Sequence, residues 1–224
     1  MPTARNLPPT HAHGHKMDAV YKNQVSIYDF TRKYYLLGRD RLITDMAVEN
    51  GNTVLEIACG TGRNLIRTAK RYPGAQYYGV DISSRMLDYA DWAVDRAGMA
   101  DKIALAQADA VTFSPTDTFD RGTYDRIVFS YCLSMIPDWQ GALSHAVPMI
   151  APGGSLHIVD FGVMSRLPGW FRAGMHGWLK KFHVTPRDSM ASFVPEVAEK
   201  HGLTFEVTSL YRDYATLVTI KRPA

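Results

Sequence analysis

The chain has little of what marks a secreted, membrane-spanning or nucleic-acid-binding protein. Among its 224 residues there are two cysteines, too few for a disulfide framework, which favours a reducing compartment. No signal peptide is recognisable, and no apolar run approaches the length of about 18 residues that spans a bilayer, so any membrane contact is expected to be peripheral. The formal net charge is only +3, which argues against a general nucleic-acid binder but leaves room for a local basic patch. These absences predict a cytoplasmic protein of one main domain, with 46% hydrophobic residues available for its core.

Metal ligands at a convincing spacing are also lacking. Cys59 and Cys132 do not form such a pair, and alternate histidines occur in the run from His11 to His15. That run lies among prolines and a glycine, a composition typical of a mobile tail. We therefore predict a disordered tail over residues 1–16 and no metal.

The stretch from Thr53 to Ser83 organises the rest of the chain. An apolar run predicts a buried strand over 54–58, a glycine turn follows it, and an amphipathic segment predicts a helix that ends near Pro73. A second strand over 77–80 is followed by Asp81. This is a βαβ unit with glycines after its first strand and an acidic residue after its second.

The spacing of these residues indicates a nucleoside ligand. Gly60 and Gly62 lack a Cβ, so the backbone can turn sharply and a ligand can approach it. Asp81 is placed to accept hydrogen bonds from both hydroxyls of a ribose. The third glycine of a dinucleotide-binding turn is missing, because Leu65 occupies its position.

The run resembles motif I of class I S-adenosylmethionine-dependent methyltransferases, LE(V/I)GCGTG, with Ala58 in place of the first glycine. The stretch 78–83 is similar to motif II, and 107–110 is similar to the element whose acidic residue meets the adenine amino group. Arg39 pairs with the cofactor carboxylate or merely flanks a helix start. The resemblance implies S-adenosylmethionine as cofactor, S-adenosylhomocysteine as product, and contacts from the following residues: Arg39, Glu56, Ala58, Cys59, Gly60, Thr61, Gly62, Asp81, Ile82, Met86, Asp109, Ala110 and Ser130.

The same resemblance implies an α/β fold over residues 50–224. We expect a Rossmann-like seven-stranded sheet of order 3-2-1-4-5-7-6, with the last strand antiparallel and helices on both faces. A four-residue turn is expected at 151–154, a polar loop at 112–123 and a closing hairpin at 203–221. Residues 17–49 predict two helices, 17–37 and 39–49, which in this class form a lid over the cofactor.

Three runs carry a more specific resemblance: residues 27–39, residues 130–139 (SYCLSMIPDW) and residues 159–162. They are similar to the diacylglyceryl-homoserine N-methyltransferases of betaine-lipid synthesis. That family implies trimethylation of a lipid amine at the membrane surface, and association with the enzyme that makes the homoserine lipid. The alternatives are a phosphatidylethanolamine N-methyltransferase, a small-molecule or quinone methyltransferase, and a non-catalytic nucleotide-binding adaptor.

An amine needs only a lone pair and in-line placement to accept a methyl group, so positioning is expected to dominate catalysis. The trimethylated product is a cation that tyrosine rings can stabilise. The candidates for this role lie near the predicted carboxyl-end loops or in the lid: Tyr28, Tyr131, Tyr211 and Tyr214.

Residues 161–187 contain no Asp or Glu but include Arg166, Arg172, Lys180, Lys181 and Arg187. A helical wheel places Leu167, Phe171, Met175, Trp178 and Phe182 on one side. A basic amphipathic helix with aromatic residues is typical of a membrane interface, with Trp170, Phe171, Trp178 and Phe182 for insertion and anionic lipids as partners. The alternative is an ordinary helix that packs on the core.

Overall fold

A computed structural model describes residues 35–182 and 184–224 of the chain. Its centre is a seven-stranded sheet of order β3-β2-β1-β4-β5-β7-β6, which confirms the predicted fold. The strands are β1 (Thr53–Ile57), β2 (Gln76–Asp81), β3 (Ile103–Gln107), β4 (Tyr124–Ser130), β5 (Ile150–Phe161), β6 (Thr204–Leu210) and β7 (Ala215–Lys221).

The middle of the sheet is parallel and covered on both faces. All five residues of β1 are buried, as expected of a strand with helices on each side, and β1 pairs in parallel with β2 and β4. β7 runs antiparallel to both β5 and β6, and the connection Tyr211–Tyr214 closes the predicted hairpin. All the parallel strands therefore end at one edge of the sheet, where ligands bind in open α/β folds.

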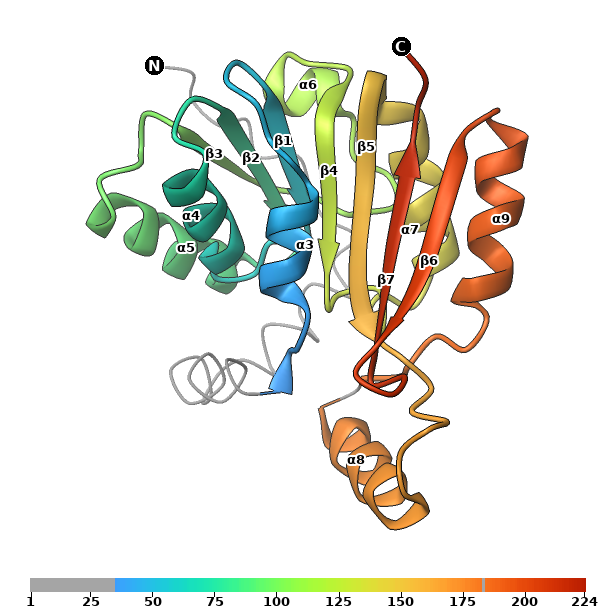
Figure 1. Ribbon diagram of the computed structural model, residues 1–224. Helices are drawn as coiled ribbons and strands as arrows, with labels where there is room; N and C mark the ends of the chain where they lie inside the picture. Colours follow the sequence, from blue (N-terminus) through green and yellow to red (C-terminus); the bar gives the residue numbers. More distant parts are fainter. Residues whose placement is uncertain (1–34, 183) are drawn as a thin grey trace.

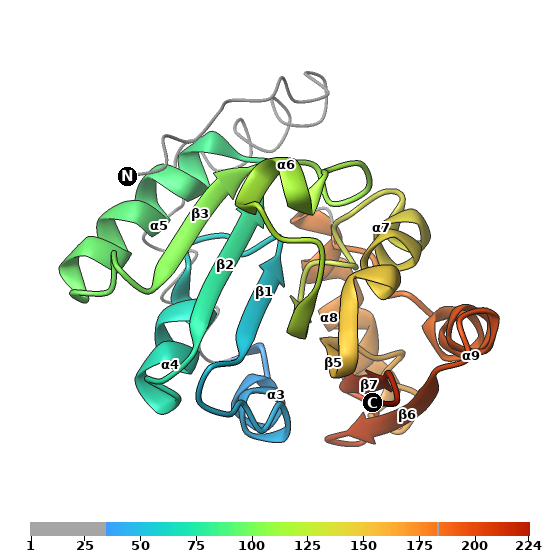
Figure 2. The ribbon, with the colours of Figure 1, turned by 90° about the horizontal axis from the view of Figure 1, so that it is seen from above.

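Helices pack on both faces of the sheet (Figures 1 and 2). α3 (Arg39–Asp45), α4 (Arg63–Arg71) and α5 (Ser84–Arg96) contribute to one buried cluster, and α7 (Trp139–Ala146) and α9 (Met190–Lys200) contribute to the other. Ser83 caps α5 by accepting a hydrogen bond from the Met86 N–H. The short α6 (Pro115–Phe119) and the 3-10 helix η1 (Val147–Met149) complete these layers.

Helix α8 (Gly169–Lys181) stands apart from these two layers (Figure 1). It lies beyond the carboxyl ends of the parallel strands, between β5 and α9 in the chain. No helix in the described ranges is long and apolar enough to cross a membrane.

Several predicted boundaries were wrong. The expected polar loop at 112–123 contains α6, because Ser114 accepts a hydrogen bond from the Asp117 N–H and Pro115 starts the helix. The expected turn at 151–154 lies inside β5, where Gly153 donates to the Pro223 carbonyl and the register shifts between Tyr124 and Arg126. The helix predicted over 39–49 ends at Asp45. The predicted tail and most of the first lid helix lie outside the described residues.

Candidate functional site

The glycine turn follows β1 and bends at positions with positive φ. Gly60 has φ +56° and Gly62 has φ +69°, conformations that glycine adopts without a Cβ penalty. Ala58 also has φ +58°, at the position where the family motif has a glycine. A Cβ on Gly60 would meet nothing within 4 Å, so the strain of a larger residue there would come from the backbone, and its side chain would enter open space.

Asp81 holds this turn in place. Its Oδ2 accepts a hydrogen bond from the Gly60 N–H at 2.8 Å, and its Oδ1 accepts one from the Ser83 N–H at 2.9 Å. The residue is 9% exposed. A carboxylate has about four acceptor positions, so both oxygens keep capacity for ribose hydroxyls. Asp81 therefore shapes the turn in addition to the ligand contact that the sequence predicts.

Glu56 places a second carboxyl group behind the turn. It is buried, and Asn64 donates to its Oε1 at 2.9 Å. Desolvation by burial raises the pKa of Glu56 from 4.5 to about 7, while Asn64 and the charge of Arg39 oppose the rise. A buried carboxyl group poised near neutral pH is suited to a cationic ligand group, whose charge would favour its ionised form.

A cavity of about 90 Å³ opens between the turn and the end of β4. Asn64 and Ser130 line it, and the buried atoms Asn64 Oδ1 and Ser130 Oγ have no hydrogen-bond partner within the described part of the chain. Buried polar atoms are normally paired, so such atoms in a cavity are suited to a bound polar ligand. Together with Asp81 and Glu56, they provide a donor and acceptor set that fits a nucleoside carrying an amino acid.

The structure brings most of the predicted cofactor residues to this cavity. Those that line it are Arg39, Glu56, Ala58, Cys59, Gly60, Thr61, Asp81, Ile82, Met86 and Ser130. Gly62, Asp109 and Ala110 do not line it, and Asp109 accepts a hydrogen bond from the Val111 N–H at 2.8 Å. Lining residues outside the predicted cofactor set are Leu36, Arg63, Asn64, Cys132, Met135 and Ile136.

Some of the missed residues had a signal in the sequence. Arg63 and Asn64 follow the glycine turn directly, so the first turn of α4 had to face the same ligand. Met135 and Ile136 lie in a loop whose path is set by distant residues. Asp160 accepts a hydrogen bond from the Ser134 N–H at 3.0 Å, and Arg187 donates to the carbonyls of Leu133 and Ile136.

Tyr131 forms a wall between the cofactor cavity and a second, aromatic cavity. Its backbone has φ +54°, it is 2% exposed, and its hydroxyl donates to the Leu37 carbonyl. Burial, and then the charge of Asp160, raise the pKa of the Tyr131 phenol well above its usual value. Backbone strain of this kind is found at functional sites.

The aromatic cavity lies under α8 and measures about 10 Å³, roughly the space of one water molecule. Its aromatic lining residues are Tyr35, Tyr131, Phe161, Trp178 and Phe182. The ring centroids of Tyr35 and Trp178 are 4.5 Å apart, and those of Tyr131 and Phe161 are 4.7 Å apart. Trp178 and Phe182 therefore close this cavity from the side of α8.

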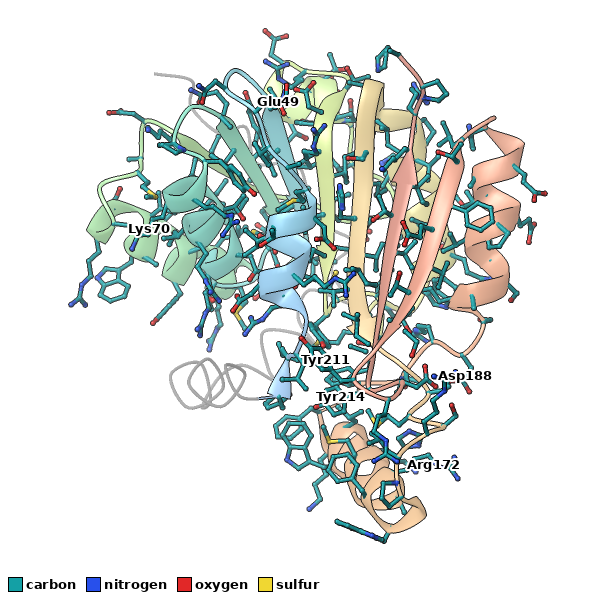
Figure 3. The ribbon with its side chains drawn as sticks, in the orientation of Figure 1. Glu49, Lys70, Arg172, Asp188, Tyr211 and Tyr214 are labelled. Carbon is teal, nitrogen blue, oxygen red and sulfur yellow. The ribbon has the colours of Figure 1, made fainter. Side chains whose placement is uncertain are left out.

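The other predicted tyrosines are placed differently. Tyr214 lines neither cavity; it is 6% exposed and its hydroxyl donates to the Tyr35 carbonyl at 2.8 Å. Tyr211 is half exposed and lines a groove beside α3 (Figure 3). Tyr28 lies outside the described residues. Within these residues, no group of three or more His, Cys, Asp or Glu side chains gathers as a metal site.

The strand order of the sheet, with a cavity at the carboxyl ends of its parallel strands, is that of the class I methyltransferase fold. The sequence agrees, because residues 54–154 match the family model described as a methyltransferase domain. Over these residues the chain is similar to a methyltransferase domain.

Curated relatives of the chain carry quinone-related names. It is 28% identical over 152 residues to a 2-phytyl-1,4-naphtoquinone methyltransferase of Nostoc punctiforme, covering 65% of the chain and 64% of the relative. It is 31% identical over 132 residues to a ubiquinone/menaquinone biosynthesis C-methyltransferase of Cereibacter sphaeroides, covering 59% of the chain and 50% of the relative. The chain thus spans between half and two thirds of the length of these relatives.

Solved structures share the fold at low sequence identity. An O-methyltransferase family protein from Burkholderia thailandensis has a TM-score of 0.70 at 16% identity, covering 93% of this chain and 63% of that one. The Haemonchus contortus phosphoethanolamine N-methyltransferase 2, in complex with S-adenosyl-L-methionine, has a TM-score of 0.68 at 16% identity, covering 83% and 52%.

Proposed function

We propose that this chain is an S-adenosylmethionine-dependent N-methyltransferase that converts the amine of a diacylglyceryl-homoserine lipid to a trimethylated betaine. The observation that carries the proposal is Tyr131, one side chain that lines both the cofactor cavity and an aromatic cavity. An acceptor amine in the aromatic cavity would lie next to the methyl donor.

The chemistry asked of the protein is placement. Bound S-adenosylmethionine supplies a methyl group on a positively charged sulfur, an electrophile that a neutral amine can attack. In each transfer the C–S bond would break as the C–N bond forms. The ammonium made in the first two transfers would lose a proton to solvent, and the third transfer would leave a quaternary ammonium that has no proton to lose. The loop held by Asp160 and Arg187 would fix the position of the reactants, since positioning provides much of the rate enhancement in such reactions.

The aromatic lining of the second cavity suits an amine that becomes a cation. Rings of Tyr, Trp and Phe attract an ammonium by roughly 0.5–2 kcal/mol each. The Tyr131 phenol is held neutral by its raised pKa, so it adds no charge that would trap the product. The cavity of about 10 Å³ admits a headgroup only if α8 shifts, so α8 would act as the cover of the acceptor site.

A second candidate is a quinone-type acceptor. The curated relatives named above carry quinone names, and a flat aromatic ring could also stack in a cavity of aromatic side chains. Phosphatidylethanolamine is a third candidate, because it offers the same amine. The three sequence runs that resemble betaine-lipid enzymes favour the homoserine lipid over both.

We further propose that the chain works at the surface of an anionic membrane. The structure corrects the expected set of inserting residues, because Phe171, Trp178 and Phe182 are partly buried against the core. Trp170 is 78% exposed, and Lys180 and Lys181 are exposed on the same helix. Arg172 is also exposed on this helix (Figure 3). Exposed Trp and basic residues support contact with the headgroup region of a bilayer.

A methylation assay tests the proposal. The purified chain is incubated with labelled S-adenosylmethionine and one acceptor at a time. Diacylglyceryl-homoserine should gain three methyl increments by mass spectrometry, and phosphatidylethanolamine and demethylmenaquinone should gain none at equal concentrations. Asp81→Asn should weaken donor binding by about 1.5–3 kcal/mol, the range for a hydrogen bond to a charged group. Methylation of demethylmenaquinone alone would replace the proposal by its quinone alternative.

A further inference from the structure

A groove of about 480 Å³ runs beside α3 and the first turns of α4. It is continuous with the cofactor cavity, because Leu36, Arg39 and Arg63 line both. Tyr211, from the connection between β6 and β7, lines the groove close to the start of α3 (Figure 3). A ligand in the groove would therefore lie next to the methyl donor without occupying its cavity.

The groove is strongly basic. Its lining includes Arg39, Arg41, Arg63 and Arg67 but one acidic residue, Asp40. Asp40 Oδ1 lies 2.6 Å from Arg67 Nη2, and the Arg41 Nε lies 3.2 Å from Asp45 Oδ2. Helix α4 itself contains no Asp or Glu. With Asp45 counted beside Asp40, two carboxylates stand against four guanidinium groups, which leaves the groove with an excess of two positive charges.

The arginines divide into two groups by position. Arg39 is 8% exposed and interacts electrostatically with Glu56, so it belongs to the cofactor cavity. Arg63 and Arg67 are one helical turn apart on α4, and Arg41 lies on α3 across the groove. Residues four apart on a helix point to the same side, so these guanidinium groups converge on one volume.

We propose that this groove binds an oxyanion, a carboxylate or phosphate group carried by the methyl acceptor. The guanidinium fork matches both groups through paired hydrogen bonds, and an anion would relieve the repulsion among the arginines. This inference rests on the proposed function and deepens it: a homoserine headgroup carries a carboxylate on the same carbon as its amine, and the groove would hold that carboxylate. A neutral quinone ring would leave the groove without a partner.

Inorganic phosphate and acetate serve as probes. They are titrated into the full chain saturated with S-adenosylhomocysteine, and the variants are Arg41→Gln, Arg67→Gln and the pair. The control is Arg96→Gln, because Arg96 lies on α5 over the ring of Trp92 and does not line the groove. Calorimetry or NMR shifts should show phosphate binding weakened about tenfold in the double variant, with control binding unchanged.

Two readouts separate the failure modes. If the double variant and the control bind phosphate and acetate equally, or the wild-type chain binds neither, the oxyanion site is wrong. If the wild-type chain does not bind S-adenosylhomocysteine, the proposed function is wrong instead. Glycerol 3-phosphate and vesicles of phosphatidylglycerol distinguish the source of the anion: if the double variant loses both, the ligand is a lipid headgroup, and if it loses only the soluble phosphate, the ligand is free.

Discussion

Ala58 shows at the residue scale how this chain departs from its family motif. It adopts φ +58° at the first glycine position, which costs an L-residue about 1–2 kcal/mol. Tyr131 has a similar conformation at the boundary of the two cavities. Both strained residues lie where the cofactor and acceptor would meet, a distribution typical of functional strain.

Ala58→Gly should therefore stabilise the ligand-free chain. Relief of backbone strain exceeds the entropy that glycine loses on folding, so we expect a gain of up to about 1 kcal/mol in urea unfolding. Ala93→Gly, in the middle of α5 where φ is helical, is the matched control and should lose about 1 kcal/mol. A loss of stability in Ala58→Gly would show that the alanine methyl group makes a contact worth more than the strain.

Glu56 predicts a pH dependence of stability. Its native pKa of about 7 lies above the unfolded value of 4.5, so the native chain binds more protons between these values. Stability from this group is present below pH 4.5 and is lost as the pH rises to 7, by an amount on the order of 3 kcal/mol. Urea unfolding of the ligand-free chain at pH 5 and pH 8 measures it.

Glu56→Gln should remove this part of the pH dependence, because an amide does not ionise. Glu199→Gln, on the exposed side of α9, should leave the difference between pH 5 and pH 8 as in the wild type. If Glu56→Gln and the wild type lose the same stability over this range, the carboxyl group is ionised throughout.

At the scale of elements, the loop after β4 depends on a side chain far along the chain. Arg187 donates to the carbonyls of Leu133 at 3.0 Å and Ile136 at 2.7 Å, and Ile136 lines the cofactor cavity. Arg187→Lys keeps the charge but loses the fork, so we expect donor affinity to fall about 3- to 10-fold in calorimetry. Arg172→Lys on α8 is the control, and unchanged affinity in Arg187→Lys would contradict this role.

Helix α8 has an inner and an outer tryptophan. Trp178 packs against Tyr35 and Phe182, whereas Trp170 is 78% exposed. Trp178→Ala should lower the free energy of unfolding by about 1–3 kcal/mol, less than for a fully buried ring. Trp170→Ala should leave stability within about 0.5 kcal/mol and weaken vesicle binding. Equal stability of the two variants would mean that α8 is not held to the core by its inner face.

For the whole molecule, the net charge of +3 is too small to drive membrane binding by itself. We expect binding to anionic vesicles that weakens with added salt, because each basic residue near the surface contributes about 1 kcal/mol. Replacing Lys180 and Lys181 by Glu should reduce sedimentation with vesicles while donor binding stays intact. If the wild type and this double variant sediment equally, the proposed contact of α8 with the membrane is wrong.

Local chemistry explains what the sequence predicted. The glycine turn, Asp81 and the order of apolar runs follow from backbone freedom and periodicity, which neighbouring residues decide. The strand order and most of the residues that line the cofactor cavity were expected from the resemblance that these motifs carry to class I methyltransferases. The sequence also showed the apolar side of α8 as a helical stripe. It did not show which residues that stripe would contact.

The tertiary structure decided which of these residues meet. Only packing shows that Phe171, Trp178 and Phe182 face the core while Trp170 faces outward, and that Tyr214 holds the Tyr35 carbonyl instead of lining a cavity. The contacts of Arg187 with the loop after β4, and the gathering of arginines from α3 and α4, join segments far apart in the chain. Such contacts depend on the distance between elements after folding, which periodicity along one element does not contain. The sequence by itself determined the sheet and the glycine turn, and the three-dimensional packing determined the acceptor cavity and the basic groove.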